Sequence, residues 1–181
     1  MAAPLRDDFE GRHALAWTII RPDAPHASLT KHPGKLTITT QGGDLLGDGK
    51  RYAAATGLHA RNVYLIDNPL PGGDLVVTTH IESFRPRTPW QQAGLVIYDD
   101  DDNYLKWDFE VSQRAASGQA LAVVRETNSV RAPEISELPA PLDRVWLRII
   151  KRGGRPACVH LVLCSHVTVI TVSVSVLSTI S

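Results

Sequence analysis

Residues 92–111 read QAGLVIYDDDDNYLKWDFEV, and this stretch decides the fold. In its second half, NYLKWDFEV (103–111), apolar and charged residues alternate: Leu105, Trp107, Phe109 and Val111 against Lys106, Asp108 and Glu110. Because successive side chains of a strand point to opposite faces, this pattern predicts a strand with one face in the core and one charged face in solvent. QAGLVIY (92–98) predicts a second strand, and the polar run YDDDDNY (98–104) predicts the tight antiparallel turn between them.

Similar segments occur along most of the chain. The 12 prolines and 13 glycines separate short runs rich in Val, Ile, Thr, Tyr and Trp. Alternation places Val145, Leu147 and Ile149 on one face, and no stretch has a capped 3.6-residue period. The sequence therefore predicts an all-β sandwich of antiparallel sheets. The further predicted strands are 15–20, 34–40, 61–66, 74–84, with Leu75, Val77, Thr79 and Ile81 on one face, 119–126 and 144–151.

The charge balance narrows the choice of function. The 181 residues carry 19 basic and 19 acidic side chains, so no net field attracts a polyanion, and we expect no nucleic-acid partner. The first residues lack the pattern of an export signal, and no segment before residue 156 has the roughly 18 apolar residues of a membrane span. We therefore expect a soluble chain without a membrane partner, cytoplasmic by default. Cys158 and Cys164 are too few for a disulfide framework.

The composition changes near the end of the chain. Residues 156–181 contain no charged and no aromatic side chain. Their Val, Ser and Thr alternation over 167–177 predicts a strand with a one-residue slip, which could pair with an otherwise exposed sheet edge. We therefore predict a sandwich domain over 5–154 and an uncharged tail over 155–181.

The acidic turn invites a calcium hypothesis. Asp99, Asp101 and Asn103, with Glu110, fall at positions 1, 3, 5 and 12 of an EF-hand loop. Tyr104 stands where that loop requires glycine, and a strand follows in place of the exiting helix. A plain polar turn is the favoured interpretation. A structural calcium ion bound by Asp99, Asp101 and Asn103, outside any EF-hand, is a side prediction.

Two other patterns fail on spacing. GGDLLGDGKR (42–51) has Asp44 where a P-loop needs its first glycine and Arg51 where it needs Ser or Thr, so it is interpreted as a flexible connection. Cys158, His160, Cys164 and His166 have zinc-ligand chemistry, but on one strand the outer two would lie about 26 Å apart. No zinc site is predicted.

Aromatic side chains are the natural platform for a sugar ring. Trp90 lies in RPRTPWQQ (85–92) beside Arg87, and Tyr98 and Tyr104 bracket the acidic turn. We predict these four residues as carbohydrate-binding residues. No catalytic residue is predicted, because Asp108 and Glu110 on one strand face, like His80 and Glu82 on another, are interpreted as solvent-facing charge.

Several stretches resemble one known family. They are DDFEG (7–11), HARNVYLIDNPLPGGDLVVTTHI (59–81), QQAGLVIYDDDDNYLKWDFE (91–110), VVRE (123–126) and WLRIIKRGG (146–154). Together they resemble the C-terminal concanavalin A-like domain of family 43 β-xylosidases and arabinofuranosidases. The resemblance runs from about Asp7 to Gly154, and its most diagnostic part is QAGL-x-x-Y-x-D-D-x-N-Y.

This resemblance implies a jelly-roll sandwich of two curved antiparallel sheets. In the family the sandwich packs beside a five-bladed propeller that carries the catalytic carboxylates, and it has no catalytic residues of its own. Phe9, Arg61, Asn62 and the Gln92-Ala93-Gly94 run would be structural positions, with Gln92 a buried amide bonded to backbone groups. After Gly154 this sequence departs from the family, which continues with a segment such as Y-S-x-D-G-x-x-W.

The expected function is that of a non-catalytic carbohydrate-associated module. It would bind glycan weakly or support a family 43 glycosidase, with a carbohydrate or a glycosidase catalytic domain as its partner. One alternative is a small sandwich glycosidase using Asp108, Glu110 or Glu82, acting on xylosides or arabinosides. The other is a structural or interaction domain without a ligand.

Overall fold

The fold is built almost entirely from antiparallel strands. The computed structural model describes residues 5–45, 59–68, 74–152, 155–161 and 174–177. In these ranges the regular structure is strand apart from the three-residue 3-10 helix η1 (Ala24–His26). The prediction of an all-β fold is confirmed. No helix in the described part of the chain is long and apolar enough to cross a membrane.

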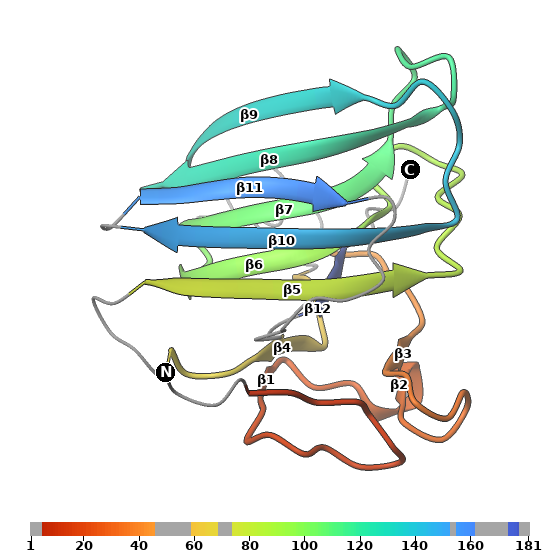
Figure 1. Cartoon of the computed structure of the whole chain (residues 1–181), viewed down its shortest axis with the longest axis vertical. Coiled ribbons are helices and arrows are strands. Elements are labelled where there is room, and N and C mark those ends of the chain that lie inside the picture. The colour runs from red at the N-terminus through yellow and green to blue at the C-terminus, as the bar shows by residue number, and fades with distance from the viewer. Residues whose placement is uncertain (1–4, 46–58, 69–73, 153–154, 162–173, 178–181) are drawn as a thin grey trace.

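Two sheets form the main layers. The larger sheet has the order β12-β6-β7-β8-β9, and the smaller has the order β11-β10-β5. In Figure 1, β5, β10 and β11 lie in front of β6, β7 and β8. The larger sheet contains β6 (Gln92–Asp100), β7 (Asn103–Val111), β8 (Gln119–Thr127), β9 (Val130–Glu137) and β12 (Val174–Leu177); the smaller contains β5 (Leu75–Glu82), β10 (Arg144–Arg152) and β11 (Arg155–Leu161).

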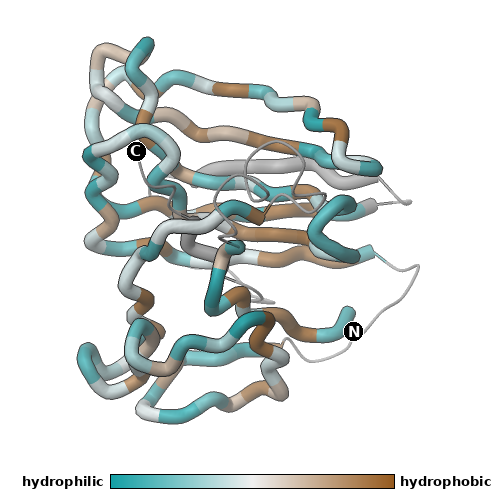
Figure 2. The backbone as a smooth tube through the Cα atoms, turned by 180° about the vertical axis from the view of Figure 1, so that it is seen from behind, coloured by the Kyte–Doolittle hydropathy of each residue, from teal (hydrophilic) through white to brown (hydrophobic). Residues whose placement is uncertain are grey.

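The main core lies between these two sheets. Strands β5, β6, β7, β8 and β10 contribute buried apolar residues to it, and Figure 2 shows hydrophobic residues recurring along the strands. Burial of each large side chain contributes about 1.5–3 kcal/mol, so this interface stabilises the domain. The core residues predicted on β10 are confirmed, with Val145, Leu147 and Ile149 fully buried. They pack with Ile81, Ala93, Leu95, Trp107, Phe109, Leu121 and Leu138.

A second apolar cluster lies on the opposite face of the larger sheet. Val96 on β6 and Tyr104 on β7 pack there with Val63 and Leu45 from the N-terminal part of the chain. Val63 belongs to β4 (Val63–Leu65), which pairs with β1 (Thr18–Ile20); β2 (Ala27–Ser28) pairs with β3 (Thr37–Ile38). The larger sheet is therefore covered on both faces at this end, where part of the candidate site lies.

Gly94 fixes how closely β6 and β7 approach each other. A Cβ atom at this position would lie 2.1 Å from the Trp107 carbonyl oxygen and 2.7 Å from Asp108 Cα. Real Cβ atoms do not approach backbone this closely, so only glycine fits. The glycine of the QAGL segment is thus required by strand packing.

Strand β9 is the outer strand of the larger sheet in the described residues, and the sequence did not predict it. All eight of its residues are exposed, so it lacks the buried face that produces alternation. Pro133 lies in its middle, opposite Val124 of β8.

The end of the chain also enters the sheets. Backbone pairing places β11 beside β10, and β12 beside β6, with Val176 opposite Ala93. The strand expected over 167–177 is described only for 174–177, and residues 162–173, which include Cys164 and His166, lie outside the described residues. So do residues 46–51 of the glycine-rich connection.

Candidate functional site

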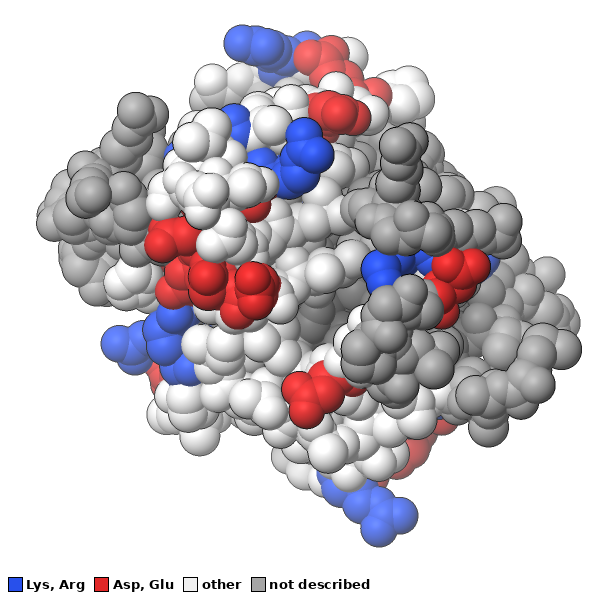
Figure 3. Space-filling view, turned by 90° about the vertical axis from the view of Figure 1, so that its left-hand side faces the viewer, with Lys and Arg blue, Asp and Glu red and all other residues white. Residues whose placement is uncertain are grey.

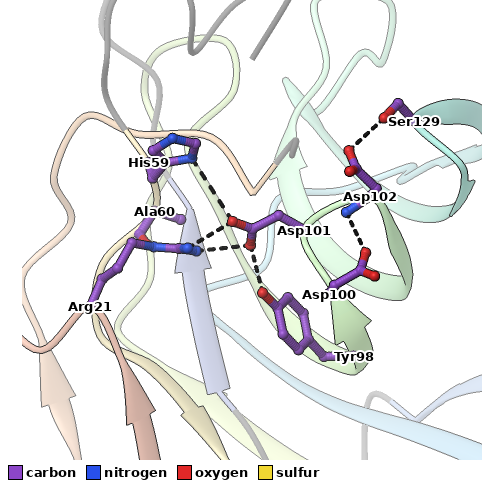
Figure 4. Close-up of polar contacts among 8 residues, drawn as sticks. All are labelled: Arg21, His59, Ala60, Tyr98, Asp100, Asp101, Asp102 and Ser129. Atoms are coloured by element: carbon purple, nitrogen blue, oxygen red, sulfur yellow. Dashed lines mark hydrogen bonds and ion pairs between the residues drawn. The ribbon is translucent and has the colours of Figure 1, made fainter. Parts of the chain in front are cut away.

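The acidic turn between β6 and β7 is held by Asp101, whose carboxylate faces the N-terminal segment (Figure 4). Arg21 donates through Nη1 to Asp101 Oδ2 at 2.7 Å and through Nη2 to Oδ1 at 3.0 Å. The Tyr98 hydroxyl donates to Asp101 Oδ1 at 2.7 Å, and His59 Nδ1 lies 4.0 Å from Oδ2. Arg21 also donates to the Ala60 carbonyl oxygen at 2.6 Å. Asp101 therefore joins three separate chain segments.

The other polar side chains of the turn stabilise the turn itself. Asp100 accepts hydrogen bonds from the Asp102 backbone N–H at 2.8 Å and from the Asn103 amide at 2.9 Å. The Ser129 hydroxyl donates to the Asp102 carboxylate, which links this turn to the β8–β9 turn. These contacts are those of a structural polar turn.

The calcium site suggested by the sequence stays a prediction. Within the ranges that the structure describes, no group of three or more His, Cys, Asp or Glu side chains is placed to hold a metal ion. Asp101 binds Arg21 and Tyr98, and Asn103 binds Asp100, while Asp99 is exposed. An ion would have to replace these protein partners.

The charged face of β7 is buried, which corrects the prediction that it faces solvent. Lys106, Asp108 and Glu110, together with Gln92 of β6, are each 7% exposed or less. Alternation identifies the residues that share a face, but it does not tell whether that face is covered. Here the neighbouring strands place small residues beside the charges: Gly94 opposite Asp108 on β6, and Ala120 and Ala122 opposite Glu110 and Asp108 on β8.

These four side chains form one polar network, which we call the β6–β7 quartet. Lys106 Nζ donates to Gln92 Oε1 at 2.7 Å and lies 3.3 Å from Asp108 Oδ2. The Gln92 amide donates to Glu110. Gln92 is therefore buried as expected, but its partners are side chains and not backbone groups.

Asp108 is the member of the quartet whose carboxylate is least well satisfied. Neither of its carboxylate oxygens accepts a hydrogen bond from the described residues, although Lys106 is in ion-pair contact. Burial is the main cause that raises the pKa of Asp108 to about 6; Glu110 adds to the effect and Lys106 opposes it. A raised carboxyl pKa is a property that general acids share, but a side chain that is 2% exposed has no access to a glycan.

Glu82 lies in a different layer from Asp108 and Glu110. It is on β5 of the smaller sheet, where it binds Lys35 and lies 3.1 Å from His80 Nδ1. The His80 ring stacks on Trp146 with centroids 4.2 Å apart. The three carboxylates of the glycosidase alternative do not form one site.

The four predicted carbohydrate-binding residues fall into two groups. Tyr98 and Tyr104 are opposite each other at the acidic-turn end of β6 and β7. Trp90 and Arg87 precede β6, at its other end. A nine-residue strand spans about 30 Å, so no single short glycan contacts all four.

Both tyrosines are engaged inside the protein. Tyr104 is 5% exposed, and its hydroxyl donates to Glu126 Oε2 at 2.8 Å. Burial, followed by the hydrogen bond to Glu126, raises the pKa of Tyr104 well above its ordinary value. Burial and the bond to Asp101 do the same for the pKa of Tyr98. The rings of Tyr98 and Tyr104 pack in the second apolar cluster. Trp90 and Arg87 remain as the candidates for glycan contact.

Residues 83–91 form the loop between β5 and β6 (Figure 1). Trp90 lies in this loop. Its side chain is 59% exposed, and its backbone has a φ of +70°, which is rare for a bulky residue. The Gln91 side chain accepts hydrogen bonds from the Arg87 N–H at 2.7 Å and the Thr88 N–H at 3.3 Å. Gln91, which the sequence did not single out, therefore folds the loop back on itself beside Trp90.

The face drawn in Figure 3 carries acidic and basic side chains next to one another. Acidic side chains gather at the left centre of this view, with basic side chains above and below them, so both signs of charge occur on this face, as in the chain as a whole with its 19 basic and 19 acidic residues.

The two packed antiparallel sheets define a β-sandwich of the concanavalin A-like class. Residues 6–159 match the family model described as the beta xylosidase C-terminal concanavalin A-like domain. The chain belongs to this family, as its sequence resemblance implied, and the predicted jelly-roll sandwich is confirmed. Within the family, the domain is the C-terminal module of family 43 xylosidases.

Two solved structures share the fold. A variant of the GH43 protein BlXynB from Bacillus licheniformis has a TM-score of 0.71 at 17% identity, over 96% of this chain. A xylan beta-1,4-xylosidase from Bacillus halodurans has a TM-score of 0.61 at 20% identity, also over 96% of this chain. The match covers 35% of each of those chains, so this chain spans about a third of their length. No curated protein was found to match the chain.

Proposed function

We propose that this chain is a non-catalytic accessory domain that supports a family 43 glycosidase and binds its glycan weakly through loop 83–91. Membership of the xylosidase C-terminal domain family supports the accessory role. The observation that carries the glycan contact is Trp90, an exposed indole on a constrained loop. An indole can stack on the apolar face of a pyranose ring, and one ring with few polar partners gives weak binding.

The burial of the β6–β7 quartet supports a non-catalytic role. A glycosidase needs two carboxyl groups that flank a substrate bond, one as acid and one as base or nucleophile. Asp108 and Glu110 share a strand face, but they are 2% and 7% exposed and lie among Lys106, Gln92 and small residues. Their contacts are those of a buried structural network.

Affinity gel electrophoresis with soluble xylan tests the glycan contact. The wild-type chain should be retarded by xylan, and Trp90→Ala should reduce this retardation by roughly severalfold, because the stacking ring is removed. Ile135→Ala is the matched control, since Ile135 is another exposed apolar side chain, 54% exposed, on β9. Equal retardation of wild type and Trp90→Ala would contradict the assignment of this loop.

The glycosidase alternative rests on one observation, the raised pKa of Asp108 beside Glu110. Chromogenic xylosides and arabinosides test it directly. We expect no turnover by the purified chain. Turnover that Glu110→Gln abolishes, while the variant stays folded, would establish the alternative and overturn the accessory proposal.

A further inference from the structure

Three arginines lie in, or next to the start of, the loop that carries Trp90. Arg85 and Arg87 belong to the loop, and Arg144 begins β10 opposite Glu82, the last residue of β5. The side chains of Arg85 and Arg144 are 71% and 66% exposed, and Arg87 is also exposed. The Ser83 N–H donates to the Asp143 carbonyl oxygen at 2.8 Å, which fixes the start of the loop to the start of β10.

The neighbouring carboxylates do not balance these arginines. Asp143 is shared, since it lies 3.6 Å from Arg85 Nη2 and 3.5 Å from Arg144 Nε. Glu82 binds Lys35. Among the described residues of the loop and of the contacts just given, Arg85, Arg87, Arg144 and Lys35 stand against Asp143 and Glu82, which is a surplus of two positive charges in a chain with no net charge.

This combination favours a particular class of glycan. A neutral sugar offers only hydroxyl groups, which need no cation for recognition. A guanidinium group matches a carboxylate in charge and in the spacing of its donors. An exposed indole beside exposed guanidinium groups is therefore suited to a chain that carries both pyranose rings and carboxylates.

We infer that loop 83–91 and the start of β10 recognise an acidic glycan, a xylan-type chain substituted with uronic acid. This inference rests on the proposed function, since it names the glycan that Trp90 contacts. Trp90 would stack on a sugar ring, while Arg87 and Arg144 would bind the carboxylate of a side group. Each exposed ion pair is weak, so we expect a preference over neutral xylan of about threefold to tenfold at low ionic strength.

The test compares three polymers in affinity gels and by calorimetry: glucuronoxylan, the same polymer after chemical reduction of its carboxyl groups, and unsubstituted xylan. The wild-type chain should prefer glucuronoxylan, and both carboxyl reduction and added salt should remove the preference. Replacing both Arg87 and Arg144 by Gln should lower the affinity for glucuronoxylan far more than the affinity for unsubstituted xylan. Trp90→Ala should weaken binding to all three.

Arg125→Gln is the matched control for charge. Arg125 is an exposed arginine of β8 that lies opposite Leu105, towards the acidic-turn end of the sheet. Its replacement should leave the preference unchanged. A decrease as large as that of the double variant would show a general charge effect and overturn the inference.

The possible failures can be told apart. Equal affinity for glucuronoxylan and its reduced form would overturn the acidic class and leave the proposed glycan contact standing. Displacement of glucuronoxylan by polyglutamate at equal charge would overturn it as well, because it would show anion binding without sugar recognition. Binding to none of the three polymers would overturn the glycan part of the proposed function and the inference with it.

Discussion

Arg21 holds both carboxylate oxygens of Asp101, at 2.7 and 3.0 Å, across 80 positions of sequence. The pair joins the segment after β1 to the β6–β7 turn, and thus connects the N-terminal strands to the larger sheet. Both side chains are partly buried, with 29% and 20% exposure. Paired charges with this degree of burial contribute more to stability than those on an open surface.

Replacing Arg21 by Ala should therefore destabilise the domain by about 1–3 kcal/mol, because Asp101 loses a charged partner and Ala60 loses a donor. Urea unfolding followed by circular dichroism measures the change. The control is Arg6→Ala, which removes an ion pair of 2.6 Å to Asp8 whose side chains are 65% and 54% exposed. Its effect should stay below about 1 kcal/mol. Equal effects of the two variants would contradict the role given to Arg21.

Replacing Asp7 of the DDFEG segment should destabilise the domain about as much as replacing Arg21. Its carboxylate accepts hydrogen bonds from the Phe9 and Ala14 backbone N–H groups, both at 2.9 Å, and from Trp17 Nε1 at 2.7 Å. Asp7→Asn replaces one of the two acceptor oxygens by an NH2 group, which cannot accept these hydrogen bonds. The substitution should lower the free energy of unfolding by about 1–3 kcal/mol. The neighbouring Asp8→Asn, at an exposed position, is the control.

The pH dependence of the Asp7 contribution has a definite sign. Burial alone would raise the pKa of Asp7, but the bonds from Trp17 and the backbone outweigh it and hold the pKa below its ordinary value. The folded state then binds fewer protons than the unfolded state near the ordinary pKa of 3.8. The stability from Asp7 is present above this pH and is lost on acidification, so the wild type and Asp7→Asn should converge in acid.

The stability contributed by Asp108 should depend on pH in the opposite sense to that of Asp7. With a pKa raised from 3.8 to about 6, the folded state binds more protons than the unfolded state between these values. The stability contributed by Asp108 should therefore fall as the pH rises from about 4 to 6, by up to roughly 2–3 kcal/mol. Urea unfolding at several pH values should show that Asp108→Asn removes this component from the wild-type curve. Parallel curves for the two proteins would contradict the raised pKa.

Chelation tests the calcium prediction. An ion bound to the native state would raise the melting temperature, and EDTA would lower it. Because Arg21 and Tyr98 already hold Asp101, we expect the same melting temperature with excess calcium and with EDTA. A calcium-dependent increase that Asp99→Asn removes would establish the site instead.

The sequence was most informative where one face of a strand is buried. Alternation in 103–111 predicted β7, and the core positions Trp107 and Phe109 followed from it. The same pattern could not tell that Lys106 and Asp108 are covered, because coverage depends on elements distant in the sequence. Strand β9 was missed for the opposite reason, since none of its residues is buried.

The candidate site was only partly predictable. Trp90 and Arg87 were singled out because they lie in a short loop with Pro86 and Pro89, and their contact with a glycan stays a prediction. Tyr104 was predicted as a sugar contact, but its hydroxyl binds Glu126 of β8 inside the protein. This partner depends on the register between β7 and β8, which the sequence of one strand does not determine. Arg144 was not predicted, because it comes next to the loop only through the pairing of β10 with β5, where it lies opposite Glu82.

Pro133 removes one hydrogen-bond donor from the outer edge of β9, the outer strand of the larger sheet in the described residues. The Leu138 N–H bonds to the Gln119 carbonyl oxygen, and hydrogen-bonded pairs alternate along antiparallel strands, so the nitrogen of Pro133, opposite Val124, points away from β8. That nitrogen carries no hydrogen, and the outward ladder of β9 is interrupted in its centre. If a strand of a second molecule paired with the outer edge of β9, the carbonyl oxygen facing Pro133 would receive no hydrogen bond. We expect copies of the domain to remain separate along β9 even when crowded together on a polymer.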